Sequence, residues 1–216
     1  MTPPPTTHLL YLHGFRSSPQ SVKAQQLARL VAEQFPNLHW WCPALPPSPQ
    51  AAVAQLMAGV QDWPRASMAI IGSSLGGFYG HVMARQLGCP VVLLNPAVHP
   101  ARDLAAHIGV HPAWHDPSQR IHFEAGHIDE LRALQATPAT CTPPCLAVIA
   151  QGDEVLDWRE MLSAYGQDRV RLLPGSDHGL SDFDQHLPEI LEFLGLRVPA
   201  ASGEPGMGKS AHVRLI

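Results

Sequence analysis

Short continuous apolar segments alternate with longer amphipathic segments along most of the chain, and this alternation limits the possible folds more than any other feature. Apolar runs at 9–12, 68–71 and 91–94 are too short for core helices, and segments with helical periodicity separate them. Runs of this kind are typical of parallel strands, because helices bury both faces of each strand. We therefore predict an α/β fold with a mostly parallel central sheet and helices on both faces.

The same patterns predict the positions of the individual elements. Strands are expected at 9–12, 38–42, 68–71, 91–94, 146–150 and 170–173, and helices at 21–35, 51–63, 75–86 and 187–194. Residues 97–144 interrupt the alternation, with short helical pieces such as 128–134 and no strand signal. Long excursions inside a domain are usually functional, so we expect a small lid insertion at 97–144. One domain is expected over 1–198, followed by a flexible tail over 199–216.

The segment 72–77 (GSSLGG) contains the motif G-x-S-x-G between an expected strand and an expected helix. A nucleophile on a tight strand-to-helix turn has a strained backbone, so its neighbours two positions away must lack bulk. Ser74 stands at the centre of the motif and is the predicted nucleophile. Ser73 lies outside the centre and is the weaker candidate.

An acid and a base are expected after later strands, in the chain order of α/β-hydrolases. His178 follows the strand at 170–173 and would accept the proton of Ser74. Asp153 and Asp157 both follow the strand at 146–150; Asp153 leaves the strand end directly and is favoured. Asp177 adjoins the base and is poorly placed to orient its ring. The predicted triad is thus completed by Asp153 and His178.

The segment His13-Gly14-Phe15 follows the first expected strand. In α/β-hydrolases the loop at this place supplies one oxyanion N–H, and the residue after the nucleophile supplies the other. The predicted oxyanion hole therefore consists of the backbone N–H groups of Phe15 and Leu75. Loss of one such donor typically costs about 3 kcal/mol of transition-state stabilisation.

Five segments together resemble the YqiA-like esterase family of bacteria, over roughly residues 8–195. They are 11–19, 72–79, 94–98, 152–157 and 177–178. The resemblance implies a compact α/β-hydrolase with a minimal lid that acts on acyl esters or thioesters. It places the nucleophile, acid and base of the family on Ser74, Asp153 and His178.

Composition and the N-terminal residues exclude several other classes of protein. The net charge is -4, which provides no basic surface for nucleic acid or an anionic membrane. Residues 1–7 lack the pattern of a signal peptide, and no apolar stretch is long enough to span a bilayer. We expect a cytoplasmic protein with a small-molecule substrate; the oligomeric state stays open.

Three further patterns suggest ligands but lack the required context. The spacing of His107, His111 and His115 could align imidazoles on a helix, but Gly109 and Pro112 interrupt any helix there, so a surface or lid role is expected. The spacing of the cysteine pair at 141–145 fits neither a zinc nor a thioredoxin motif. Residues 203–210 match a phosphate-binding P-loop without the preceding strand and the following long helix. We expect no cofactor and no metal.

These observations predict a serine esterase or thioesterase that hydrolyses small to medium acyl esters through an acyl-enzyme on Ser74. An acyltransferase or an amidase with the same triad is one alternative, because pocket shape decides the acyl acceptor. A catalytically silent α/β-hydrolase that binds a small molecule or a protein is the other.

Overall fold

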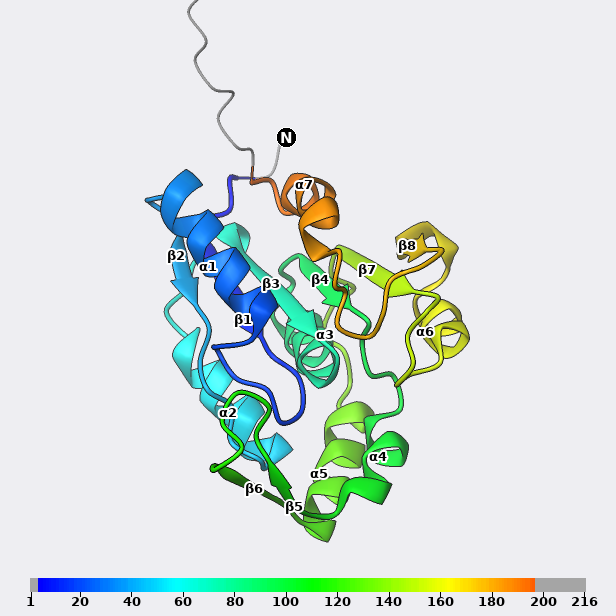
Figure 1. Ribbon diagram of the computed structural model, residues 1–216. Helices are drawn as coiled ribbons and strands as arrows, with labels where there is room; N and C mark the ends of the chain where they lie inside the picture. The colour runs from blue at the N-terminus through cyan, green and yellow to red at the C-terminus, as the bar shows by residue number, and fades with distance from the viewer. Residues whose placement is uncertain (1–3, 197–216) are drawn as a thin grey trace, which may run out of the picture.

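The computed structural model describes residues 4–196 and contains a central sheet of six parallel strands (Figure 1). The strand order is β2-β1-β3-β4-β7-β8. The strands are β1 (His8–Leu12), β2 (His39–Trp41), β3 (Met68–Ser73), β4 (Val91–Leu94), β7 (Cys145–Ala150) and β8 (Val170–Leu173). The four central strands consist almost wholly of buried apolar residues, as expected for strands covered on both faces.

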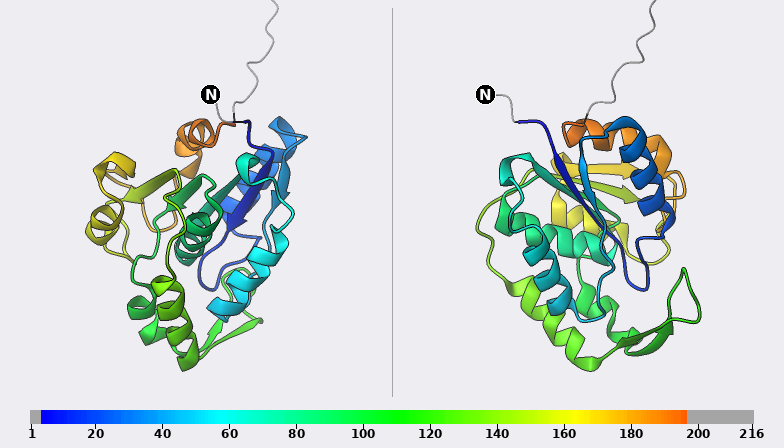
Figure 2. Two further views of the ribbon diagram at one scale, coloured as in Figure 1. Left: turned by 180° about the vertical axis from the view of Figure 1, so that it is seen from behind. Right: turned by 90° about the vertical axis from the view of Figure 1, so that its left-hand side faces the viewer.

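Helices cover both faces of this sheet (Figure 2). On one face α1 (Val22–Gln34) and α7 (Phe183–Phe193) pack over a core that includes Leu9, Ile71 and Val148. On the other face α2 (Pro49–Gly59), α3 (Leu75–Leu87) and α6 (Trp158–Tyr165) share a second core. The predicted fold class is confirmed.

Local signals explain where several helices begin and end. The side chain of Ser21 accepts a hydrogen bond from the N–H of Ala24 and caps α1, and Ser48 caps α2 in the same way through Ala51. The helix expected at 187–194 begins four residues earlier, at Phe183. Its pattern was obscured by Pro188, which lies inside the helix and whose nitrogen cannot donate to the carbonyl oxygen of Asp184.

The region 97–144 contains two strands, so the expectation of no strand there was wrong. β5 (Gly109–Pro112) and β6 (Arg120–Phe123) form an antiparallel pair, flanked by α4 (Pro100–Asp103) and α5 (Ala125–Ala136). Most residues of both strands are at least partly exposed, so they carry no apolar run. Their residues pair with each other instead of with the core sheet, and an apolar pattern is therefore not needed.

Some predictions fall outside the described residues. The tail at 199–216 and the P-loop-like segment at 203–210 both lie there. Over residues 4–196, none of the helices has the length and apolar character needed to cross a membrane.

The carboxyl ends of the parallel strands lie at one edge of the sheet, where open α/β sheets build their sites. The loop after β1 carries Phe15, and the turn after β3 carries Ser74. The loops after β7 and β8 carry Asp153 and His178. All predicted site residues therefore come to the same edge.

Candidate active site

Ser74 lies on the turn between β3 and α3 with a φ of 56°, a strained value for a residue with a side chain. The chain crosses itself closely here. A Cβ atom on Gly72 would collide with the carbonyl oxygen of Gly76, and one on Gly76 would collide with that of Leu12. The two glycines of the motif are thus required by the geometry that presents the Ser74 hydroxyl.

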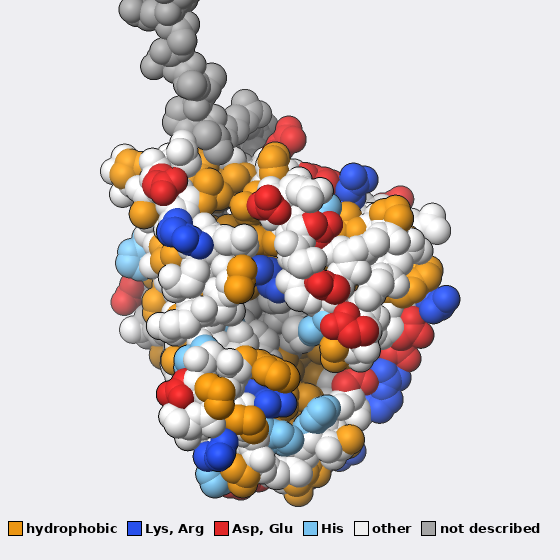
Figure 3. Space-filling view, in the orientation of Figure 1, with side chains coloured by type: hydrophobic (Ala, Val, Ile, Leu, Met, Phe, Trp, Pro, Cys, Tyr) orange, Lys and Arg blue, Asp and Glu red, His pale blue; other side chains and the backbone are white. Residues whose placement is uncertain are grey.

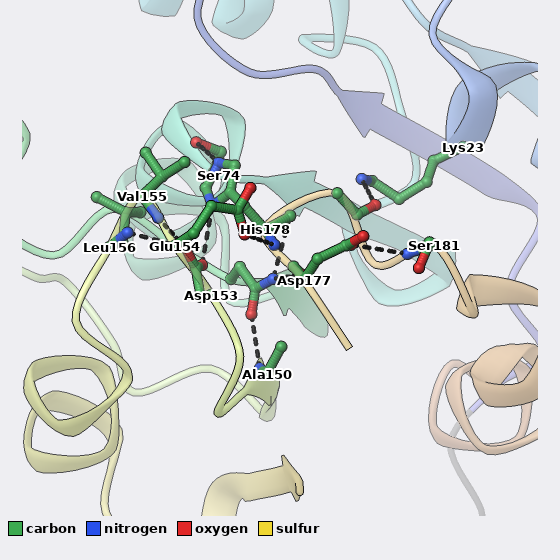
Figure 4. Close-up of polar contacts among 12 residues, drawn as sticks. Lys23, Ser74, Ala150, Asp153, Glu154, Val155, Leu156, Asp177, His178 and Ser181 are labelled. Carbon is green, nitrogen blue, oxygen red and sulfur yellow. Dashed lines mark hydrogen bonds and ion pairs between the residues drawn. The ribbon is translucent and has the colours of Figure 1, made fainter. Parts of the chain in front are cut away.

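Three side chains form a continuous hydrogen-bonded chain at this edge of the sheet (Figure 4). His178 Nε2 lies 3.0 Å from Ser74 Oγ, and His178 Nδ1 lies 2.8 Å from Asp153 Oδ2. The side chain of Asp153 is 0% exposed and that of His178 is 20% exposed. A carboxylate on Nδ1 fixes the ring orientation and leaves Nε2 free to accept the hydroxyl proton.

The carboxylates that the sequence left open make different contacts. The other oxygen of Asp153 accepts the N–H groups of Val155 and Leu156, each at 2.8 Å, so its loop holds the carboxylate in place. Asp157 caps α6 by accepting the N–H of Arg159 at 2.9 Å. Asp177 accepts the N–H of Ser181 at 2.9 Å. Of the three, Asp153 is the one hydrogen-bonded to the His178 ring.

Asn95, directly after β4, connects the loops of the acid and the base. Its side chain is fully buried. Nδ2 donates to the carbonyl oxygens of Asp177 at 3.0 Å and His178 at 3.1 Å, while Oδ1 accepts the N–H of Ala150 at 2.8 Å. All three bonds are to backbone groups, so Asn95 fixes the loops and not the reacting side chains. Sequence reasoning missed this residue, for which a lone Asn after a strand was the available signal.

Glu154 makes a second contact between the loop after β7 and the loop after β8. Glu154 Oε2 accepts the backbone N–H of His178 at 3.0 Å. The loop after β7 therefore contacts His178 twice, through the Asp153 carboxylate on the ring and through Glu154 on the main chain.

The predicted oxyanion donors, the N–H groups of Phe15 and Leu75, are free to bind a ligand. Within the described residues neither N–H donates a hydrogen bond. The loop after β1 runs close to the nucleophile, since a Cβ on Gly14 would lie 3.2 Å from Ser74 Cβ. Leu75 begins α3, so its N–H is among those that a helix leaves unbonded.

His13 lies at the start of the loop after β1 and is 5% exposed. Its Nε2 accepts the N–H of Leu45 at 3.3 Å, and its Nδ1 lies 3.1 Å from the carbonyl oxygen of Gly14. Burial lowers the pKa of His13, so the imidazole is held neutral. A neutral ring can accept one bond and donate the other, which matches both contacts.

The β5–β6 hairpin contacts the loop after β1 through Arg16. The N–H of Trp114 donates to the carbonyl oxygen of Arg16 at 2.9 Å, and Arg16 Nε donates to that of Pro112 at 2.9 Å. The Arg16 guanidinium also lies 3.9 Å from the centre of the Trp114 ring. The rings of His107 and His111, two of the three histidines whose spacing suggests metal ligands, lie beside the Phe15 ring, with their centroids 5.9 and 5.8 Å from its centroid. Over residues 4–196, no cluster of three or more potential ligands could hold a metal ion.

Ser74 and His178 open into a cleft of about 470 Å³. An adjoining hollow of about 420 Å³ shares part of its wall, including Phe15 and His115. The walls near Ser74 also contain Ser17, Gln20, Ser21, Val22, Lys23 and Trp114. The insertion thus supplies two side chains, Trp114 and His115, to the cleft that holds the candidate nucleophile.

The four cysteines are free thiols. Burial raises the pKa of Cys42 and Cys89 to about 12 and that of Cys145 to about 11. A thiol is nucleophilic as its thiolate, so these cysteines stay unreactive at neutral pH.

Comparison with known proteins identifies the family. The family model of UPF0227, described as an uncharacterised protein family, matches residues 8–195. The chain belongs to UPF0227. The resemblance to YqiA-like esterases, drawn from five short segments, is thereby confirmed.

Solved structures similar to this UPF0227 chain are α/β-hydrolases. Alpha/beta hydrolase domain-containing protein 10 from mouse is 15% identical with a TM-score of 0.64, over 88% of this chain and 91% of that one. Est1E from Butyrivibrio proteoclasticus, with bound ferulic acid, is 15% identical with a TM-score of 0.60, over 88% and 87%. An esterase of Pyrococcus furiosus is 14% identical with a TM-score of 0.58, over 90% and 83%. At these identities the similarity shows the fold.

Proposed function

We propose that this UPF0227 member is a serine hydrolase that cleaves carboxylic ester or thioester bonds through an acyl-enzyme on Ser74. The observation that carries the proposal is the hydrogen-bonded chain from Ser74 through His178 to the buried Asp153. The strained backbone of Ser74 and the two unbonded N–H groups beside it support the same chemistry. One of the similar structures, from Pyrococcus furiosus, is itself named as an esterase.

The first half-reaction begins when Ser74 Oγ attacks the carbonyl carbon of the substrate. Its proton passes to His178 Nε2, and the Asp153 carboxylate stabilises the imidazolium through Nδ1–H. The carbonyl oxygen becomes an oxyanion and accepts hydrogen bonds from Phe15 and Leu75. The bond to the alcohol or thiol then breaks, and the leaving group takes the proton from His178.

In the second half-reaction, water hydrolyses the acyl-enzyme by the same proton transfers in the reverse order. His178 takes a proton from water, the hydroxide attacks the acyl carbon, and the Ser74 oxygen leaves with the proton on His178. The carboxylic acid is released and the enzyme returns to its first state. The proton transfers between Ser74 and His178 use side chains already within hydrogen-bond distance of each other.

Two measurements on the same proteins test the proposal. A fluorophosphonate probe should label the wild type and Ser73→Ala but not Ser74→Ala, because the probe reacts with an activated serine. A 4-nitrophenyl ester series, from acetate to long acyl chains, should be hydrolysed by the wild type, with turnover lost in Ser74→Ala. The acyl-chain length that is hydrolysed fastest would indicate the size of the cleft.

The outcomes separate this function from its alternatives. Labelling of neither wild type nor variant, with no ester turnover, would indicate a silent binding protein. Labelling of Ser74 without hydrolysis, together with acyl transfer to an added alcohol or amine, would indicate an acyltransferase.

A further inference from the structure

Lys23 is the one lysine among the described residues, where every other permanent cation is an arginine. It lies in the first turn of α1 and is a wall residue of the cleft that contains Ser74 and His178. Its ammonium donates to the carbonyl oxygen of Gly179, the residue after the candidate base (Figure 4). A lysine ammonium has three N–H donors, so two remain available to a ligand in the cleft.

The charge of the cleft is opposite to the charge of the protein. The chain has 18 acidic and 14 basic residues, yet no Asp or Glu lines either hollow within the described residues. The basic side chains that line the two hollows are Lys23, Arg16 and Arg120. Figure 3 shows basic side chains inside the hollow of this face, with acidic ones gathered outside it.

The Lys23 ammonium is only weakly neutralised by the protein itself. Asp177 is the carboxylate that faces it and raises the pKa of Lys23, but burial has the larger effect and lowers it. None of the ion pairs among the described residues joins Lys23 to Asp177, and the Asp177 carboxylate accepts the N–H of Ser181. A partly desolvated cation without a close counter-charge attracts an anion more strongly than an exposed one does.

The wall around Ser74 combines apolar side chains with a few polar ones. Ligand pockets are lined mainly by apolar side chains, and a small number of polar groups fix the orientation of the ligand. Here Ser17, Gln20 and Ser21 line the same cleft as Lys23, and the apolar lining residues are Phe15, Val22 and Trp114. This pairing suits a ligand with an organic body and one polar, charged end.

We infer that the cleft takes esters or thioesters that carry an anionic group, a carboxylate or a phosphate, and that Lys23 binds this group. The inference rests on the proposed hydrolase function and adds the class of substrate. Lys23 is thus a specificity residue, distinct from the three side chains that carry out the chemistry.

A pair of substrates that differ in one charge tests the inference. 4-Nitrophenyl hydrogen glutarate has a free carboxylate at the far end of its acyl group, and 4-nitrophenyl methyl glutarate has a neutral ester there. The wild type should prefer the anionic substrate in kcat/KM. Raising the salt concentration should reduce this preference, because added ions screen the attraction.

Three variants locate the preference. In Lys23→Met the ratio of kcat/KM for the anionic to the neutral substrate should fall roughly tenfold or more, as expected for a lost bond to a charged group. Lys23→Arg should keep most of the ratio. Arg29→Met removes one positive charge from the exposed side of the same helix and should leave the ratio unchanged.

Two sources of the anion are distinguished by inhibition. Inorganic phosphate and glutarate, compared at equal ionic strength against the neutral substrate, should compete in the wild type and lose potency in Lys23→Met. The stronger inhibitor identifies phosphate or carboxylate as the natural group.

Failure of this inference can be told apart from failure of the proposed function. Binding to Ser74→Ala, measured calorimetrically, reports on recognition without turnover. Preferential binding of the anionic ester supports the inference even if the wild type hydrolyses neither. Equal binding and equal turnover of the two substrates would overturn it and leave the hydrolase intact. An equal loss on both substrates in Lys23→Met would also overturn it, and would assign Lys23 to holding the loop at Gly179.

Discussion

The side-chain amide of Asn95 donates to the main-chain carbonyl of His178 at 3.1 Å, so the candidate base is positioned by a residue that does not touch its ring. The same amide group also contacts Asp177 and Ala150, which belong to the loop of the base and the strand that leads to the acid. A buried polar group with all its partners satisfied is costly to alter. Asn95 is therefore a positioning residue in the proposed mechanism.

Asn95→Asp should reduce kcat by at least about tenfold with a much smaller change in KM. The new carboxylate cannot donate to the carbonyl oxygens of Asp177 and His178, so the base should move away from Ser74. Steady-state ester hydrolysis and its pH profile check this.

Asn37→Asp, a change at an exposed position, is the matched control. Asn95→Ser, which keeps a small polar side chain, guards against a variant that fails to fold. A rise in KM alone, with kcat preserved in both Asn95 variants and normal thermal unfolding, would contradict the positioning role.

Asp153→Asn should lower kcat by several orders of magnitude, whereas Asp157→Asn should have little effect on it. An asparagine at 153 favours the wrong tautomer of His178 and cannot stabilise the imidazolium. Asp157 acts as a helix cap, and asparagine caps about as well as aspartate, so Asp157→Asn should lower the free energy of unfolding by less than about 1 kcal/mol. Ester kinetics and urea denaturation separate the two effects. The reverse ranking of kcat would assign the acid to Asp157.

Gly76→Ala should destabilise the protein by several kcal/mol or prevent folding, because the new methyl group would overlap the backbone of Leu12 and cannot be moved aside. Gly126→Ala is the matched control on α5, where an added Cβ meets nothing within 4 Å. The control should be neutral or stabilising by less than about 1 kcal/mol. Urea unfolding of the two variants measures this difference, and equal stabilities would contradict the tight crossing at the Ser74 turn.

Acid should weaken the fold through His81, which packs edge-on against Tyr165. Burial, with smaller effects from Arg85 and Arg169, lowers the pKa of His81 from 6.5 to about 4. Below pH 6.5 the unfolded chain takes up a proton that the folded chain does not, so stability falls until the pH reaches the folded pKa. Between pH 7 and 5 this amounts to about 2 kcal/mol.

His81→Gln should lose less stability than the wild type over this pH range, as measured by urea denaturation at pH 7 and pH 5. His122→Gln, at an exposed histidine, should retain the full loss. An identical pH response of the wild type and His81→Gln would show that other groups cause the acid destabilisation.

The central sheet was predictable because β3, β4 and β7 are buried on both faces and therefore consist of continuous apolar residues. The two strands of the hairpin and the eight-residue helix α6 were not predicted. The strands are largely exposed, and a single buried residue, Met161, marks the apolar face of α6. Short elements of this kind depend on tertiary contacts that leave no periodic trace.

The residues of the candidate site also fall into a predicted and an unpredicted group. Ser74 was predicted from its motif, and Asp153 and His178 from their order after successive strands, and the three side chains do lie within hydrogen-bond distance. Their catalytic role remains a prediction. Asn95 and Lys23 contact residues far along the chain, such as His178, 83 positions from Asn95, and Gly179, 156 positions from Lys23. No local sequence pattern predicts such contacts.

The β5–β6 hairpin contacts the loop after β1 through Arg16 and is separate in sequence from the loops that carry the candidate triad. Residues 109–123 are inserted between β4 and β7, whereas the nucleophile, the acid and the base are carried on loops outside the insertion. Exchanging this hairpin between family members, with the contact to Arg16 retained, should change which substrates enter while the bond-breaking groups stay in place. The insertion is therefore the segment in which new selectivities can arise, by evolution or by design, without rebuilding the sheet beneath.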